Sequence, residues 1–119
     1  MIIIYDSKTG NVERFVKKLN LECYRISTLL RESTPFVLVT YTTGFGSVPD
    51  TTMRFLDEYS YLLRGVATSG NQNWGDNFAK AADIISELYS VPIIHKFELS
   101  GTLTDIKIFK EGLRDLEAH

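Results

Sequence analysis

The segment MIIIYDSKTGNVERFVKKL (residues 1–19) combines a strand-like run, a polar loop and a helix-like run. Residues 1–5 form a short apolar run, which is typical of a strand buried on both faces of a sheet. After six small or polar residues, apolar side chains recur at intervals of three and four, on one face of a predicted helix: Val12, Phe15, Val16 and Leu19. This strand–loop–helix order predicts an α/β protein if it repeats along the chain.

The rest of the chain alternates in the same way. Further strands are predicted at residues 22–26, 36–41, 65–69 and 92–97, and the charge-free run FVLVTY at 36–41 is the strongest of them. Helices are predicted to start near Asp50, a candidate cap, at Asp76 and at about Thr104. Their inward-facing side chains are expected to be Met53, Leu56, Tyr59, Phe78, Ala81, Ala82, Ile85, Leu88, Ile106, Phe109, Leu113 and Leu116.

Five strands alternating with helices imply parallel strands joined by right-handed crossovers. Open parallel sheets bind ligands outside the carboxyl ends of their strands, at the point where the strand order reverses. The loops after the first, third and fourth strands should therefore hold a site. These are residues 6–12, 42–50 and 69–76, which are also the loops with the most unusual composition.

Length and composition limit the classes of protein that the chain can represent. At 119 residues and 44% hydrophobic content, we expect a single domain that buries roughly two thirds of its unfolded surface. Thirteen Lys and Arg against fifteen Asp and Glu give a net charge of −2, which argues against nucleic acid as the main partner. We expect no membrane span, because no run approaches about 20 apolar residues, and no signal peptide.

Cysteine and histidine are too few to suggest a disulfide framework or a metal centre. Cys23 is the lone cysteine, so a reducing cytoplasm is the expected location and the thiol is expected to be inert. Cys23, His95 and His119 show no ligand spacing, so we expect no metal. His95 lies in an apolar strand and is expected to be a structural residue.

The first candidate loop can be interpreted in two ways. It ends where a helix begins, and unpaired amides at a helix start stabilise an anion. Ser7 and Thr9 can add hydroxyl donors and Asn11 an amide donor, while Gly10 allows close backbone approach. Only Lys8 carries a full positive charge. The same residue types also make ordinary turns and helix caps, so a phosphate site and a plain turn both stay open.

The other two candidate loops each carry an aromatic residue among glycines. In residues 42–49, two glycines flank Phe45 and would allow a peptide to take either of two orientations, although a mobile loop is the alternative. In residues 69–75, the sole tryptophan, Trp74, follows Asn73; its flat face suits a flat ligand, and core packing is the alternative. Together with the first loop, they favour a phosphorylated planar ligand.

Four motifs carry a resemblance to a known family. The run S-K-T-G-N-V (7–12) resembles the flavodoxin phosphate loop, with Val12 in place of its final hydroxyl residue. Together with T-G-F-G (43–46), S-G-N-x-N-W-G (69–75) and K-F-E-L-S-G-T (96–102), it resembles the NrdI family, the flavodoxin-like accessory proteins of class Ib ribonucleotide reductase. The resemblance implies one α/β domain over residues 1–119. This domain is a flavodoxin-like three-layer sandwich, with a five-stranded parallel sheet of order 2-1-3-4-5 and helices on both faces.

The same resemblance implies a cofactor, partners and a role. The cofactor would be FMN, and the reduced protein would react with oxygen to supply superoxide. That oxidant would allow the dimanganese–tyrosyl radical cofactor to form in the manganese-binding small subunit of the reductase. The protein would thus be an accessory protein and not itself an enzyme, and an electron-donating reductase would be its second partner. The residues implied to bind FMN are Ser7, Lys8, Thr9, Gly10, Asn11, Val12, Thr43, Gly44, Phe45, Gly46, Asn71, Asn73, Trp74 and Gly75.

The charge of the three loops fits this role. Two unit charges about 4 Å apart repel by roughly 4 kcal/mol at an effective dielectric near 20. The loops contain only Asp6, Asp50 and Asp76, at their edges, so repulsion of an anionic reduced flavin should be weak. Asp6 is expected to be solvated. We also hypothesise that the Gly44–Phe45 peptide turns over on reduction and presents its carbonyl to the flavin N5.

Two alternatives are weighed against this interpretation. A general electron-transfer flavodoxin would share the fold and the cofactor and differ in its partner. A phosphoacceptor signalling domain would suit Asp6 and Lys96, but it needs an aspartate at the end of the third strand, where Thr42 and Thr43 stand. The segment Glu98–Thr102 has no chemical role in any of these interpretations, and partner contact and a structural turn remain equal alternatives for it.

Overall fold

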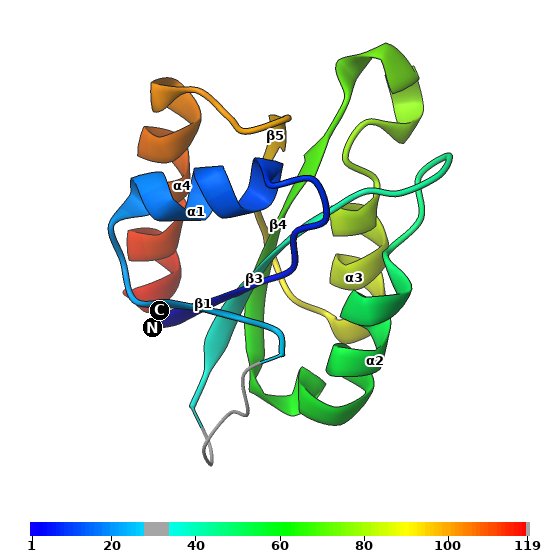
Figure 1. Ribbon diagram of the computed structural model, residues 1–119. Coiled ribbons are helices and arrows are strands. Elements are labelled where there is room, and N and C mark those ends of the chain that lie inside the picture. Colours follow the sequence, from blue (N-terminus) through cyan, green and yellow to red (C-terminus); the bar gives the residue numbers. More distant parts are fainter. Residues whose placement is uncertain (28–33, 119) are drawn as a thin grey trace.

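The computed structural model describes residues 1–27 and 34–118, and these form a parallel sheet between two helical layers (Figure 1). Its strands are β1 (Ile2–Tyr5), β2 (Cys23–Arg25), β3 (Phe36–Tyr41), β4 (Leu63–Gly70) and β5 (Ile93–Glu98), in the order β2-β1-β3-β4-β5. Helices α1 (Asn11–Leu19) and α4 (Leu103–Glu117) cover one face, and α2 (Asp50–Tyr59) and α3 (Ala81–Tyr89) cover the other. The predicted fold class and strand order are confirmed.

The two central strands, β1 and β3, separate two apolar cores. Successive side chains of a strand point to opposite faces. Accordingly, Ile3 and Val37 pack with α1 and α4, whereas Ile4 and Leu38 pack with α2 and α3. All four side chains are fully buried. Burial on both faces explains why these strands are mostly apolar and show no alternation with polar residues.

The α3 region differs most from its prediction. Residues Gln72–Asn77 form a 3₁₀ segment, and α3 starts only at Ala81 rather than at Asp76. The reason is backbone geometry, because Gly75 and Ala79 both have positive φ angles, of 55° and 50°, which end any regular helix. Leu88, which was expected to face inward, is 57% exposed. The buried stripe of α3 continues instead from Ile85 to the partly buried Tyr89.

Other predicted boundaries shift by only a few residues. The fourth strand starts at Leu63, two residues before its predicted start, and α4 starts at Leu103. Pro49 rather than Asp50 is the residue that precedes α2, and no side chain caps that helix start in the way predicted for Asp50. No helix in the part of the chain that the structure describes is both long enough and apolar enough to cross a membrane.

The expectation that Asp6 is solvated is wrong. Asp6 is 8% exposed, and its Oδ2 accepts hydrogen bonds from Thr51 Oγ1 at 2.5 Å and Thr52 Oγ1 at 2.7 Å. Thr52 Oγ1 also lies 2.8 Å from Thr40 Oγ1 on β3. The carboxylate therefore joins the end of β1 to the first turn of α2, where the helix dipole favours a negative charge.

This network yields a prediction for stability. Asp6→Ala leaves two threonine hydroxyls at the start of α2 without their acceptor, so it should lower the free energy of unfolding by about 1–3 kcal/mol. Asp6→Asn keeps an oxygen acceptor and should cost less. Urea unfolding of the three proteins measures the difference. Equal stability of Asp6→Ala and the unmodified protein would show that the network does not hold α2 in place.

Candidate functional site

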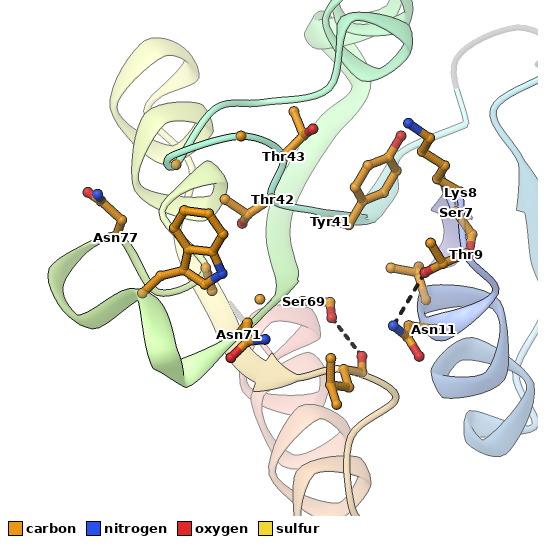
Figure 2. Close-up of a pocket in the computed structure, with 17 residues that line it drawn as sticks. Ser7, Lys8, Thr9, Asn11, Tyr41, Thr42, Thr43, Ser69, Asn71 and Asn77 are labelled. Atoms are coloured by element: carbon orange, nitrogen blue, oxygen red, sulfur yellow. Dashed lines mark hydrogen bonds between the residues drawn. The ribbon is translucent and has the colours of Figure 1, made fainter.

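A cleft of about 280 Å³ lies at the carboxyl ends of β1, β3 and β4 (Figure 2). It is lined by the three loops that the topology predicted. Predicted residues that line it are Ser7, Lys8, Thr9, Asn11, Val12, Thr43, Gly44, Gly46, Asn71 and Trp74. Among the described residues, the predicted site members that do not line it are Gly10, Phe45, Asn73 and Gly75. The structure thus brings most of the predicted residues together, and their binding of FMN stays a prediction.

The loop between β1 and α1 presents unpaired donors to the cleft. Gly10 precedes α1 with φ 90° and has no side chain of its own to cap the helix. Ser7 Oγ accepts from the amide of Glu13 at 3.3 Å, which leaves the hydroxyl hydrogen of Ser7 free to donate. Within residues 1–27 and 34–118, the backbone amides of residues 8–12 donate to no protein acceptor. Free amides at a helix start suit a phosphate or carboxylate group.

The loop after β3 is a tight reverse turn. Thr43 and Ser47 exchange backbone hydrogen bonds of 2.9 and 2.8 Å, which leave residues 44–46 at the tip. Gly44 and Gly46 have φ angles of 57° and 115°, a region that residues with a side chain rarely adopt. The turn therefore needs both glycines, and their flexibility is compatible with the hypothesised turnover of the Gly44–Phe45 peptide.

The aromatic residues of two loops meet at the mouth of the cleft. The rings of Phe45 and Trp74 lie 5.2 Å apart at an interplanar angle of 71°, an edge-to-face contact. Trp74 is 42% exposed and Phe45 is 81% exposed. The alternative that Trp74 fills the core is wrong. A flat ligand that entered between the loops would have to separate the two rings.

The loop after β4 is held by polar contacts to its own residues and to β5. Asn71 Oδ1 accepts from the amide of Asn73 at 2.9 Å, so Asn73 shapes the loop through its backbone. The amide of Gln72 donates to Glu98 Oε2 at 3.0 Å. Glu98, at the end of β5, is therefore a carboxylate outside the three loops that contacts one of them, and a loop amide already binds it.

Sequence reasoning missed four cleft residues outside the three predicted loops, namely Tyr41, Asn77, Ala79 and Leu99. Three more, Thr42, Ser69 and Gly70, lie within the predicted loops but were not among the residues implied to bind FMN. Tyr41 is the last residue of β3, a position that the rule for parallel sheets could have flagged. Gly70 is required by packing, because a Cβ there would lie 2.5 Å from the backbone nitrogen of Ala79.

The polar groups of the cleft are mostly neutral. Burial, and secondly the nearby Asp6 carboxylate, raise the pKa of Tyr41 above its ordinary value, so its phenol stays protonated at neutral pH. Within the described residues, no group of three or more His, Cys, Asp or Glu side chains could hold a metal ion, and His119 lies outside those residues. The cleft offers hydroxyls, amides and aromatic faces, which suit a planar molecule with an anionic group.

Comparisons with known proteins point to one family and one fold. The family model described as "NrdI Flavodoxin like" matches residues 3–111. A Bacillus licheniformis protein named NrdI is 57% identical over 110 residues, which cover 92% of this chain and 84% of that protein.

Solved structures of flavodoxins share the fold. A short-chain flavodoxin associated with a non-canonical PDU bacterial microcompartment matches with a TM-score of 0.75 at 21% identity, over 98% of this chain and 95% of that one. A Fusobacterium nucleatum flavodoxin bound to flavin mononucleotide matches with a TM-score of 0.64 at 16% identity, over 98% and 96% of the two chains. At these sequence identities, the two structures support a shared fold and nothing more.

The contact between the two aromatic rings can be tested by fluorescence, because Trp74 is the only tryptophan. Phe45→Ala should expose the indole, shift its emission to longer wavelength and increase its quenching by acrylamide. Tyr61→Ala, which removes an exposed aromatic ring outside the cleft, serves as the matched control and should change neither property. Identical quenching in the Phe45→Ala variant and the unmodified protein would argue that the rings do not touch in solution.

Proposed function

This chain belongs to the NrdI flavodoxin-like family, and on that premise we propose that it binds FMN in the cleft and serves class Ib ribonucleotide reductase as a redox accessory protein. In its reduced state it would pass single electrons to molecular oxygen. The resulting superoxide would serve the manganese-loaded small subunit, in which the dimanganese–tyrosyl radical cofactor forms. An electron-donating reductase would return the protein to its reduced state.

The observation that carries the proposal is the pairing of two kinds of surface in one cleft. One side offers backbone amides of the loop between β1 and α1, which have no acceptor among the described residues, with the side chains of Ser7, Thr9 and Asn11. The other side offers the rings of the Trp74 indole, which Phe45 contacts from outside the lining. The donors suit a phosphate and the rings suit a flat heterocycle. FMN has both parts, so the residues present fit this cofactor.

Each predicted group would have a separate task in binding. The amides of the first loop and the hydroxyls of Ser7 and Thr9 would hold the phosphate, and Val12, which is buried, would contribute only its backbone. Thr43, Gly44, Gly46 and Asn71 would contact the ring system, and Trp74 would cover it. When bound, FMN would supply one-electron and two-electron redox chemistry.

The charges around the cleft support a role that needs an anionic reduced state. The Asp6 carboxylate is bound by two threonine hydroxyls, and Glu98 is bound by the amide of Gln72. Asp50 and Asp76 are exposed to solvent, which screens them. None of the described residues that line the cleft is a carboxylate, so the electrostatic cost of adding electrons to a bound ligand would be limited.

The second candidate is a general electron-transfer flavodoxin, since solved flavodoxins have the same fold. It would share the fold and the cofactor, so only the partner separates the two functions. A phosphoacceptor domain is less well supported, because Thr42 and Thr43 follow β3 where that chemistry needs an aspartate.

The deciding experiment combines a spectrum with an activation assay. The purified protein should be yellow and release FMN. After reduction, it should speed tyrosyl radical formation in the manganese-loaded small subunit under oxygen, measured by electron paramagnetic resonance, while a generic flavodoxin should not. A colourless protein that takes up no FMN in excess would contradict the cofactor, and a yellow protein without radical formation would favour the second candidate.

Thr9 provides a specific test of the phosphate site. Thr9 Oγ1 accepts from Asn11 Nδ2 at 3.3 Å, which leaves the hydroxyl hydrogen available to an anion (Figure 2). A hydrogen bond to a charged group contributes about 1.5–3 kcal/mol, so Thr9→Ala should weaken FMN binding by about tenfold or more. Thr9→Ser keeps the hydroxyl and should bind nearly as well. Flavin fluorescence titration measures both affinities, and an unchanged affinity in Thr9→Ala would exclude this contact.

A further inference from the structure

The loop after β5, residues 98–102, is joined to the first turn of α1 by side chains. Ser100 Oγ donates to Asn11 Oδ1 at 2.8 Å. Arg14 donates from Nε to Ser100 Oγ at 3.0 Å and from Nη2 to Asn11 Oδ1 at 2.7 Å. Three side chains from two segments far apart in the sequence thus form a closed triangle of hydrogen bonds.

The triangle fixes the orientation of the Asn11 carboxamide. Asn carries an acceptor oxygen on one side and two N–H donors on the other. Because Ser100 and Arg14 both donate to the oxygen, the NH₂ group is turned the other way, where its Nδ2 lies 3.3 Å from Thr9 Oγ1. Asn11 and Thr9 both line the cleft, as Figure 2 shows. One hydrogen of the NH₂ group is left for a ligand.

We propose that Ser100 and Arg14 are positioning residues that orient the Asn11 amide toward the phosphate of the cofactor. This inference rests on the proposed function. It also gives a role to the segment Glu98–Thr102, which the sequence analysis left without one.

Ser100 is presented by a loop that is held on both sides. The Leu99 amide donates to Gly70 O at 3.0 Å, and Leu99 O accepts from Ser69 Oγ at 2.6 Å. Lys18 Nζ donates to the carbonyls of Ser100 and Gly101, each at 3.2 Å. Leu99 also has φ 53°, a strained conformation for a residue with a side chain. A loop fixed in this way can hold Ser100 in one place before any ligand binds.

The start of α4 adds a further anchor to the same loop. Thr102 and Asp105 form a capping box, and His95 Nε2 lies 2.7 Å from Asp105 Oδ1. Burial pushes the pKa of Asp105 upward, but the hydrogen bonds from His95 and Thr102 outweigh it and hold the pKa below its usual value. The carboxylate therefore stays charged at neutral pH, and His95 has the structural partner that its position in β5 suggested.

The geometry argues for positioning by Arg14 rather than direct contact with the ligand. Two of its donor nitrogens already bind Ser100 and Asn11, and Arg14 does not line the cleft. A Cβ on Gly10 would lie 2.8 Å from Arg14 Nη1, so the glycine makes room for the guanidinium beside the loop. Lysine at position 14 would keep the charge but could not make the forked contact.

The test compares two ligands that differ only in the phosphate, namely FMN and riboflavin. Flavin fluorescence titrations would use the full chain and its variants Ser100→Ala, Ser100→Thr and Arg14→Lys. Loss of one ordinary hydrogen bond should weaken FMN binding by about three- to tenfold in Ser100→Ala. Riboflavin affinity should change less than about twofold, because its complex has no phosphate for Asn11 to bind. Ser100→Thr keeps the hydroxyl and should restore FMN binding.

A double-mutant cycle with Asn11→Ala shows whether Ser100 acts through Asn11. If it does, Asn11→Ala/Ser100→Ala should bind FMN as weakly as Asn11→Ala alone, within about twofold. Arg14→Lys should resemble Ser100→Ala, and full FMN affinity in that variant would overturn the proposal that the two residues together orient Asn11.

The outcomes that overturn the inference are distinct from failure of the proposed function. Unchanged FMN affinity in Ser100→Ala, equal losses for FMN and riboflavin, or additive losses in the cycle would each overturn the positioning role while FMN binding stands. An unmodified protein that bound no FMN would overturn both. If Ser100→Ala did not fold, judged by circular dichroism, Arg14→Lys with the same pair of ligands would decide the question.

Discussion

Burial of β1 and β3 on both faces of the sheet is the constraint on which the rest of the molecule depends. Because Ile3 and Ile4 of β1 and Val37 and Leu38 of β3 are fully enclosed, the middle of each strand has no side chain within reach of a ligand. Polar chemistry is possible only where the strands end. The parallel arrangement brings those ends to one edge of the sheet, so loops distant in sequence become neighbours there.

The elements of the fold that could be predicted from the sequence are those determined by neighbouring residues rather than by contacts with distant ones. The strand at residues 36–41 was predicted with its observed bounds, since an apolar β-rich run has few alternatives. The predicted start of α3 was wrong because Ala79 has a positive φ angle where it packs against Gly70, which is a tertiary contact. The prediction that Asp6 is solvated was wrong for a similar reason, because its threonine partners are more than forty positions away in the sequence.

The cleft shows the same division between local and distant information. The loops around Asn11, Thr43 and Trp74 were predicted from topology and composition, whereas Leu99 was not, because the loop after a fifth strand gives no sequence sign that it folds back onto β4. Ser100 was missed for the same reason. Residues such as these reach the cleft because the chain folds back from a distant strand, and no periodic pattern in the sequence around them predicts that contact.

The backbone amides of the first loop make the site more tolerant of substitutions than of insertions or deletions. Their direction is set by the path of the chain through Gly10 and not by the identity of exposed neighbours such as Lys8. Exchanging such neighbours leaves the path intact. Adding or deleting one residue between β1 and α1 is different, because α1 is anchored by its buried face and the loop would have to take another path, which would redirect these amides. The number of residues in this loop is therefore more strictly constrained than the identity of most of them.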